Sequence, residues 1–227
     1  MIKSICKGEK LLAETHVFTK REEIANAITH GIGALLSIAA LTLLIVYSSL
    51  YGTAWHVVSF TVYGVSMLLL YVSSTMVHSF PPGKAKDFFE ILDHAAIYVF
   101  IAGSYTPIFL ILVGGGLGWT LFGIVWGLTV VGILFKIFFV KRFLIVSTLL
   151  YLAMGWLALF AIGPIINALS TAGLWFLFIG GSFYSVGTIF YMWRGFHYHH
   201  MVWHLFVIAG SIFHFFLVFY YILPVNV

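Results

Sequence analysis

The chain has 227 residues, of which 62% are hydrophobic, 19% are aromatic and only 8% are charged. Soluble proteins carry charge on about a quarter of their residues, so this composition excludes an ordinary soluble domain and favours a membrane protein. The formal net charge of +4 comes with no basic soluble module, so nucleic acid is not an expected partner. The single cysteine, Cys6, provides neither a disulfide framework nor a thiolate metal cluster.

Charged residues are absent from four long stretches, 24–83, 94–135, 143–193 and 195–227. A helix needs roughly 20 apolar residues to cross a bilayer, so the first three stretches each accommodate two spans and the last accommodates one. The sequence therefore predicts an all-α integral membrane protein, with a seven-transmembrane helix bundle in residues 24–227. The expected spans are 31–51, 55–78, 91–112, 117–136, 143–163, 173–193 and 200–223, with uncharged turns at Gly52, at 114–118 and at Gly163 with Pro164.

The positive charges predict the orientation of this bundle. If the seven spans alternate in direction, every Lys and Arg lies on one side of the membrane. The positive-inside rule makes that side cytoplasmic, so the N-terminus is expected inside and the C-terminus outside. We therefore expect a multi-pass protein of the cell membrane, with membrane lipids as its partners.

The N-terminal arm, residues 1–23, is too short and polar to form a domain. Its segment Thr19-Lys20-Arg21-Glu22 has the form of a capping box, which predicts a helix that begins there and continues into the first span. Along this helix Glu23, Asn26 and His30 share one face. That face is either a layer of residues supporting a site or a solvated cap at the start of the helix.

The second and third spans carry polar residues near the cytoplasmic side. Ser74 and His78 are four residues apart, so both side chains lie on one helix face. Asp93 stands near the start of the third span and is followed by His94. Further along, Pro107 frees a backbone carbonyl and predicts a kink, which either widens a cavity or serves ordinary helix packing.

Small residues in later spans predict close contacts between helices. Gly123 and Gly127 have the G-x-x-x-G spacing, and Gly180 with Gly181 interrupts the sixth span. His214, deep in the seventh span, is expected to form a hydrogen bond to a neighbouring helix.

The polar residues of separate helices meet at one depth and predict a metal site. His200 and His204 are four residues apart at the start of the seventh span, so they can bind one metal ion together with His78. Three histidines beside a carboxylate suit Zn²⁺, although His197 stands close enough in sequence to replace one ligand, and isolated interfacial histidines commonly bind no metal. Asp93 would hold a zinc-bound water or act as general base, and Ser74 would hydrogen-bond a reacting group or orient a ligand. This combination suits hydrolysis of an amide or ester.

An ordered set of motifs runs through the chain: Glu23-x-x-Asn26-x-x-Thr29-His30, Ser74-x-x-x-His78, Leu92-Asp93, Gly103-Ser104-x-x-Pro107, and His200-x-x-x-His204 with His214-Phe215. On these residues, the chain resembles the hemolysin III branch of the progestin and adipoQ receptor family over residues 20–223. The resemblance implies seven helices with the N-terminus inside and a zinc ion near the cytoplasmic face, held by three histidines that match His78, His200 and His204. It also places Asp93 beside the zinc water and Ser74 at the serine of the motif. His94 stands where eukaryotic relatives usually carry an aromatic residue, and it is either a spare ligand or merely a neighbour of Asp93.

Three functions are compatible with these features. The first is a zinc-dependent hydrolase of a lipid amide or ester in membrane-lipid homeostasis, similar to the ceramidase-like activity attributed to adiponectin receptors. The second is a pore-forming, cytolytic protein, as the family name suggests, and the third is a membrane sensor or receptor that zinc only stabilises. An open coordination position facing a lipid cavity would favour the hydrolase, and a sealed site with four protein ligands would favour the sensor. The short arm makes hormone-receptor signalling doubtful, and no G protein is expected as a partner.

Overall fold

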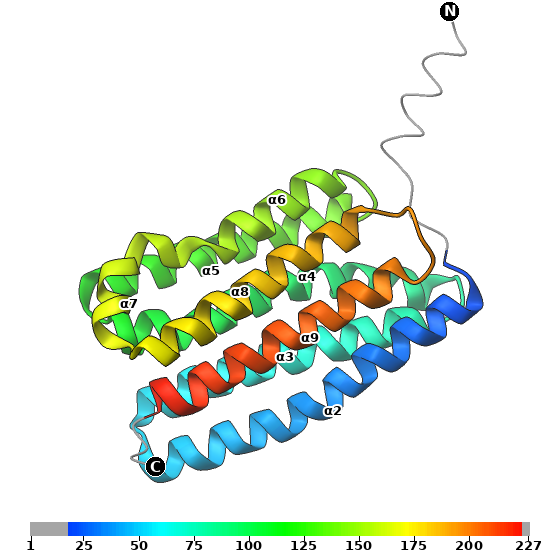
Figure 1. Ribbon diagram of the computed structural model, residues 1–227. Helices are drawn as coiled ribbons and strands as arrows, with labels where there is room; N and C mark the ends of the chain where they lie inside the picture. The colour runs from blue at the N-terminus through cyan, green and yellow to red at the C-terminus, as the bar shows by residue number, and fades with distance from the viewer. Residues whose placement is uncertain (1–17, 224–227) are drawn as a thin grey trace, which may run out of the picture.

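The computed structural model describes residues 18–223, and these residues form helices and short connections with no strand among them (Figure 1). Most of the predicted N-terminal arm, including Cys6, and the C-terminal residues 224–227 lie outside the described residues. Seven helical stretches are long and apolar enough to cross a membrane, which confirms the predicted all-α fold. The helices are α2 (Lys20–Tyr51), α3 (Ala54–Ser79), α4 (Lys84–Pro107) with a π-helical continuation (Ile108–Val113), α5 (Gly115–Phe139), α6 (Leu144–Gly155), a 3₁₀ segment (Leu157–Ala161), α7 (Ile162–Ala168), α8 (Thr171–Met192), and α9 (His199–Leu217) with a π-helical end (Val218–Ile222).

The helices run along one common direction in a single bundle (Figure 1). Helices α2, α3 and α9 lie on one side and α5 and α6 on the other, with α4 and α8 between them. The start of α2 and the α3–α4, α5–α6 and α8–α9 connections lie at the same end of the bundle, which we call the charged end. Seven described basic residues stand there: Lys20, Arg21, Lys84, Lys86, Lys141, Arg142 and Arg194. The predicted clustering of charge on one side is confirmed, and the cytoplasmic orientation of that side stays a prediction.

Helix α2 begins at the predicted capping box. The Thr19 hydroxyl accepts a hydrogen bond from the Glu22 backbone N–H at 3.3 Å, and the Glu22 carboxylate accepts one from the Thr19 backbone N–H at 2.9 Å. The other Glu22 oxygen accepts a hydrogen bond from the backbone N–H of Tyr198, in the α8–α9 connection, at 3.0 Å. These bonds satisfy orphan amides of the first turn and fix the start of α2 against the start of α9.

The end of the fifth span differs from the prediction. The turn expected at Gly163 and Pro164 does not occur, because α7 runs through both residues to Ala168. Proline is tolerated in the first turn of a helix, where its missing N–H would have no intrahelical partner. The 3₁₀ segment before α7 places Pro164 in such a first turn, and the chain reverses instead just before α8, where Ser170 caps the helix.

Pro107 marks a change of helix type. Helix α4 ends there, and the next six residues form a π-helix that closes with a hydrogen bond from Gly114 N–H to the Phe109 carbonyl. Gly114 has a φ of 60°, a left-handed conformation that glycine adopts without steric cost. The predicted disturbance at Pro107 therefore takes the form of a wider helical turn, with Ile108 facing a cavity described below.

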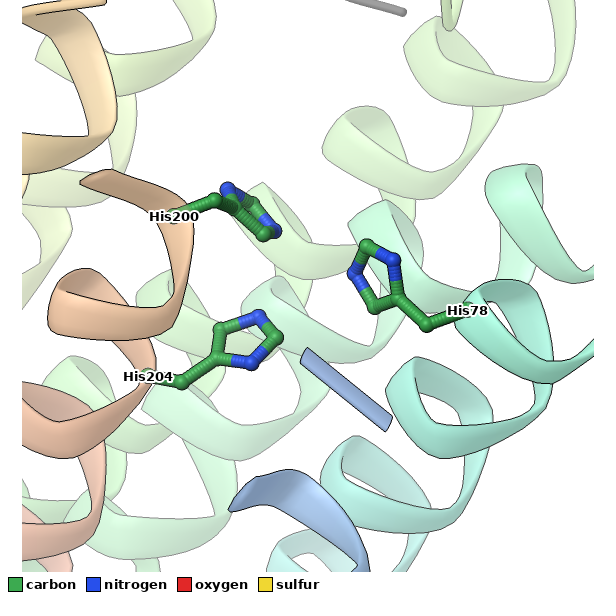
Figure 2. Close-up of side chains that lie close together, drawn as sticks. All are labelled: His78, His200 and His204. Carbon is green, nitrogen blue, oxygen red and sulfur yellow. The ribbon is translucent and has the colours of Figure 1, made fainter. Parts of the chain in front are cut away.

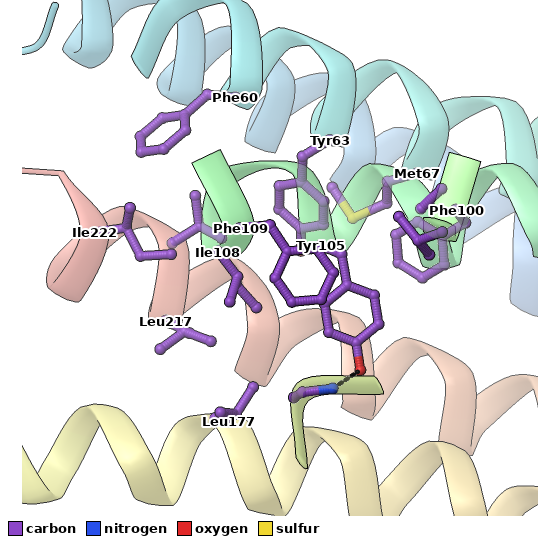
Figure 3. Close-up of a cluster of buried hydrophobic side chains, with 14 of the residues drawn as sticks. Phe60, Tyr63, Met67, Phe100, Tyr105, Ile108, Phe109, Leu177, Leu217 and Ile222 are labelled. Carbon is purple, nitrogen blue, oxygen red and sulfur yellow. Dashed lines mark hydrogen bonds between the residues drawn. The ribbon is translucent and has the colours of Figure 1, made fainter. Parts of the chain in front are cut away.

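Aromatic and aliphatic side chains pack together in the core of the bundle (Figure 3). The rings of Tyr105 and Phe109 stack with their centroids 4.6 Å apart. The Tyr105 hydroxyl donates a hydrogen bond to the Gly155 carbonyl and accepts one from the Ala158 backbone N–H at 3.2 Å. It thus pairs backbone groups where α6 gives way to the 3₁₀ segment, as buried backbone groups require.

One of the two predicted glycine contacts is present. A Cβ added to Gly180 would lie 2.6 Å from Nε2 of His214, so α8 and α9 approach closely there. The His214 Nε2 also hydrogen-bonds the Leu177 carbonyl of α8 at 3.2 Å, which confirms the expected bond between helices. The expected contact at Gly123 and Gly127 is wrong, because nothing within the described chain lies within 4 Å of a Cβ at either position. The buried stripe of α5 follows Gly118, Leu121, Val125, Thr129, Gly132 and Lys136, and leaves these two glycines on another face.

Candidate metal centre and its cavity

Three histidines converge at the charged end of the bundle (Figure 2). His78 comes from the last turn of α3, and His200 and His204 come from the first turns of α9. One ligand nitrogen from each ring lies within 4.8 Å of the other two, and this group can hold a metal ion. The i, i+4 spacing places the two α9 imidazoles on one face, 4.5 Å apart between ring centroids, and the packing of α3 brings the third ring to them.

A carboxylate orients His78. Its Nδ1 lies 2.6 Å from Oε2 of Glu23, so the ring donates its Nδ1–H to the carboxylate. The opposite nitrogen, Nε2, is buried and has no hydrogen-bond partner among the described residues. A histidine held by a carboxylate through one nitrogen, with the lone pair of the other nitrogen exposed toward further histidines, is typical of a metal ligand.

His204 is oriented by the same helix, α2. Its Nδ1 lies 3.3 Å from the Asn26 carbonyl and 3.2 Å from the Thr29 hydroxyl. Since the Thr29 hydroxyl donates to the backbone at Ala25, its oxygen can accept from the Nδ1–H of His204. Both contacts occupy Nδ1 and leave Nε2 as the nitrogen available to a metal.

The predicted supporting residues of α2 lie directly behind the three histidines. Glu23 contacts His78, and the Asn26 backbone contacts His204. The His30 ring stacks on His204 with a centroid distance of 3.4 Å and packs edge-on against Tyr71 at 5.0 Å. Asn26 and His30 are both buried, so this face of α2 is an internal surface of the site, and the alternative of a solvated helix cap is wrong.

The three histidines line a cavity of about 890 Å³ that continues into the interior of the bundle. Ser74, one turn before His78, and Asp93 on α4 line the same cavity, as do Glu23 and His30. Beyond the histidines the lining includes Phe100, Ile101, Ile108, Leu177, Phe178 and Val207. The structure thus places every predicted site residue except Asn26 in the lining of one cavity, and the chemical roles of Ser74 and Asp93 stay predictions.

The two alternative histidine ligands lie outside the group. His94 hydrogen-bonds the Glu90 carbonyl through Nδ1 at 2.8 Å and faces the Tyr191 hydroxyl through Nε2 at 3.4 Å. Its ring therefore joins α4 to α8. The His197 side chain is 86% exposed and stands 3.6 Å from Glu22, at the surface of the charged end.

Sequence reasoning missed three residues that touch the site. Phe18 packs its ring 5.0 Å from that of His200, Thr29 contacts His204, and Lys86 contacts Glu23. The motif that contains Glu23 and Asn26 includes Thr29, which is a usable signal. No pattern marks Phe18, which precedes α2, or Lys86, which lies in the first turn of α4.

Comparison with known proteins decides the family. The pattern that defines the proteins described as "Haemolysin-III related" matches residues 18–215, a range that contains all the predicted site residues. The chain belongs to this family. It is 58% identical over 209 residues to the "Hemolysin-3 homolog" of Bacillus subtilis (strain 168), covering 92% of this chain and 98% of the relative. It is 56% identical over 204 residues to "Hemolysin-3" of Bacillus cereus, covering 90% and 93%.

A more distant relative connects the family to animals. The human "Monocyte to macrophage differentiation factor" is 27% identical over 207 residues, which cover 88% of this chain and 84% of the relative. The resemblance predicted from the ordered motifs is therefore confirmed, including its distant link to the progestin and adipoQ receptors. Together with seven apolar helices, family membership identifies a multi-pass membrane protein.

Proposed function

We propose that this protein is a zinc-dependent hydrolase of lipid amides or esters that serves membrane-lipid homeostasis from the cytoplasmic side of the cell membrane. The observation that carries the proposal is that the three convergent histidines line a large cavity whose lining also includes Asp93 and Ser74. A metal that only stabilised the bundle would need no such cavity. A hydrolase needs space for its substrate at the metal.

The donor set suits zinc. Three imidazole nitrogens are the ligands of many catalytic zinc sites, which keep one position open for substrate or water. The buried Nε2 of His78 has no hydrogen-bond partner among the described residues, and its lone pair would be satisfied by coordination to a bound metal. When bound, zinc would polarise a carbonyl and lower the pKa of water toward neutrality.

The remaining chemistry falls to residues of the chain. Hydrolysis adds water across the acyl bond and releases a carboxylic acid with an amine or an alcohol. In our proposal, the Asp93 carboxylate accepts the proton of the attacking water and delivers it to the leaving nitrogen or oxygen. Ser74, buried one turn before His78, donates a hydrogen bond to the substrate carbonyl.

The shape and lining of the cavity favour a lipid substrate. A volume of about 890 Å³ lies within the range of small-molecule sites, roughly 300–1,000 Å³. The part of the cavity away from the histidines is lined mostly by apolar side chains of helices that are long enough to cross a bilayer. An acyl chain of the substrate would occupy this part, with the bond to be hydrolysed near the histidines. No nucleic acid or G protein is required.

Metal analysis of the purified protein tests the first half of the proposal. We expect about one zinc per chain in the wild type, less in His78→Ala and in His200→Ala/His204→Ala, and an unchanged content in Asp93→Asn. The wild type and Asp93→Asn are then compared on lipid amides and esters, and only the wild type should release fatty acid. Well-folded wild type that contains no zinc, prepared without chelators, would exclude the hydrolase mechanism.

A cytolytic function is the second candidate, because the relative at 56% identity is named Hemolysin-3. Vesicles that contain the reconstituted protein and a trapped dye distinguish the two functions. Dye release that persists in the histidine variants would support a pore, and full retention beside lipid hydrolysis would support the enzyme. Bound zinc with neither activity would instead favour a zinc-stabilised sensor or receptor.

A further inference from the structure

We propose that Lys86 is a positioning residue of the metal centre, which acts through Glu23 to hold His78 in the orientation that binds metal. The inference rests on the proposed metal centre and adds a residue on a fourth helix to it. Lys86 lies in the first turn of α4, outside the motifs that predicted the site.

The Lys86 ammonium makes three contacts at the charged end. Its Nζ lies 2.7 Å from Oε1 of Glu23, 2.9 Å from the Val77 carbonyl and 3.5 Å from the Phe80 carbonyl. An ammonium group has three protons to donate, so these acceptors match its capacity. Two of them belong to the end of α3, directly beside His78, and the third belongs to α2.

The two oxygens of Glu23 have separate partners. Oε1 accepts from Lys86 at 2.7 Å, and Oε2 accepts from Nδ1 of His78 at 2.6 Å. With one oxygen fixed by the ammonium, the carboxylate plane cannot rotate away from the imidazole without breaking the ion pair. The Lys86 and Glu23 side chains are only 24% and 21% exposed, so water screens this pair less than it screens a surface ion pair. Lys86 therefore fixes Glu23, and Glu23 fixes the face that His78 presents to His200 and His204.

A purely structural role makes a different prediction. If Lys86 only capped the carbonyls at the end of α3, its removal would lower the stability of the metal-free protein and leave zinc affinity unchanged. If it acts through Glu23, zinc affinity must fall even where stability is retained. Hydrogen-bonding partners of metal ligands typically change metal affinity by about 10–100-fold.

The test measures the zinc dissociation constant of the full-length protein in detergent, by competition with a chromogenic chelator. We expect Lys86→Met to weaken zinc binding by about tenfold, the low end of the roughly 10–100-fold effect of losing a direct hydrogen-bonding partner of a ligand, because Lys86 bonds Glu23 and not His78 itself. The exposed neighbour Lys84→Met should match the wild type. The absorption spectrum of the Co²⁺-loaded protein should change in Lys86→Met and not in Lys84→Met. If Lys86→Met does not fold, Lys86→Gln keeps a donor for the α3 carbonyls without the charge.

A double variant separates the two roles. Because Lys86 acts through Glu23, Lys86→Met/Glu23→Gln should bind zinc no more weakly than Glu23→Gln alone. A dissociation constant in Lys86→Met equal to that of Lys84→Met, with a wild type that binds zinc, would overturn the positioning role and leave the proposed function intact. A wild type that binds no zinc would overturn both.

Discussion

The substitution Gly180→Ala should destabilise the bundle at the contact between α8 and α9. The added Cβ would lie 2.6 Å from Nε2 of His214, well inside van der Waals contact. The His214 ring cannot retreat freely, because it hydrogen-bonds the Leu177 carbonyl at 3.2 Å and packs edge-on against Tyr184 at 5.3 Å. The helices must therefore separate, or the ring must give up its hydrogen bond.

The size of the effect follows from these contacts. Overpacking a well-packed site costs about 1–3 kcal/mol, and a hydrogen bond between membrane helices contributes about 0.6 kcal/mol. A total near 2 kcal/mol corresponds to a fall of about 4–8 °C in the unfolding midpoint for a protein of this size. Zinc content should stay unchanged, because His214 lies roughly 15 Å from His204 along α9.

The neighbouring glycine provides a matched control. Nothing lies within 4 Å of a Cβ added to Gly181, so Gly181→Ala should retain the wild-type midpoint or raise it, since alanine favours a helix over glycine by about 1 kcal/mol. Thermal unfolding in detergent, followed by circular dichroism, gives both midpoints. Equal midpoints for Gly180→Ala and Gly181→Ala would refute the close contact between α8 and α9.

The remaining predictions concern the site and its rim. Thr29→Val should weaken zinc binding by less than about tenfold in the chelator assay, because the Asn26 carbonyl still orients His204. Zinc affinity should fall as the pH is lowered, since imidazoles must lose their protons to bind metal, and equilibrium dialysis at several pH values measures this. Lys141→Met should destabilise the protein by less than about 1 kcal/mol in thermal unfolding, because its 2.8 Å pair with Asp87 is exposed. Asp87 raises the pKa of Lys141 above its ordinary value, so this small stabilisation is present at neutral pH and is lost only in strongly alkaline solution.

The charge pattern was sufficient to predict the fold because a bilayer imposes a simple rule on sequence. Stretches without charge must be long enough to span, and the turn glycines divide them correctly at Gly52 and Gly114. The ends of helices were harder to predict, because a helix can continue beyond the membrane. Helix α2 begins at Lys20, whereas the expected span begins at residue 31. The capping box at Thr19 was the better guide, since it reports local hydrogen bonding rather than hydropathy.

The errors came from motifs whose meaning depends on neighbours. Gly123 and Gly127 have the spacing of a helix contact, but spacing does not tell which face of α5 meets other helices. Pro164 was expected to end a helix and instead lies in the first turn of one, because a 3₁₀ segment precedes it. Lys136, at the last position of the expected span 117–136, was counted among the charges on one side of the membrane and is fully buried in α5, with its ammonium 5.9 Å from the centre of the Tyr151 ring.

The site could be predicted as far as local periodicity reaches. The i, i+4 spacing alone puts His200 and His204 on one face of a helix. The distribution of charged residues predicted the cytoplasmic ends of the spans, and so placed His78 at the same depth. The sequence also named His78 as the third ligand, and the structure shows why His94 stays apart from the group: Glu23 holds His78 toward α9, whereas His94 faces the Tyr191 hydroxyl. The contact that Lys86 makes from the first turn of α4 belongs to no periodic pattern and no motif, so only the structure shows it.

The arrangement around the three histidines favours a catalytic site over a purely structural one. A structural zinc is typically closed by four protein ligands, and the described residues offer one group of three. Polar and ionisable groups in a membrane protein are costly, yet Ser74 and Asp93 face the same cavity as the histidines and contribute no ligand to that group. A zinc ion that only stabilised the bundle would not need Asp93 and Ser74 in the lining of a mostly apolar cavity. Hydrolysis of a lipid needs a general base, a hydrogen-bond donor and space for an acyl chain, so the proposed hydrolase would account for Asp93 and Ser74, to which a structural metal gives no role.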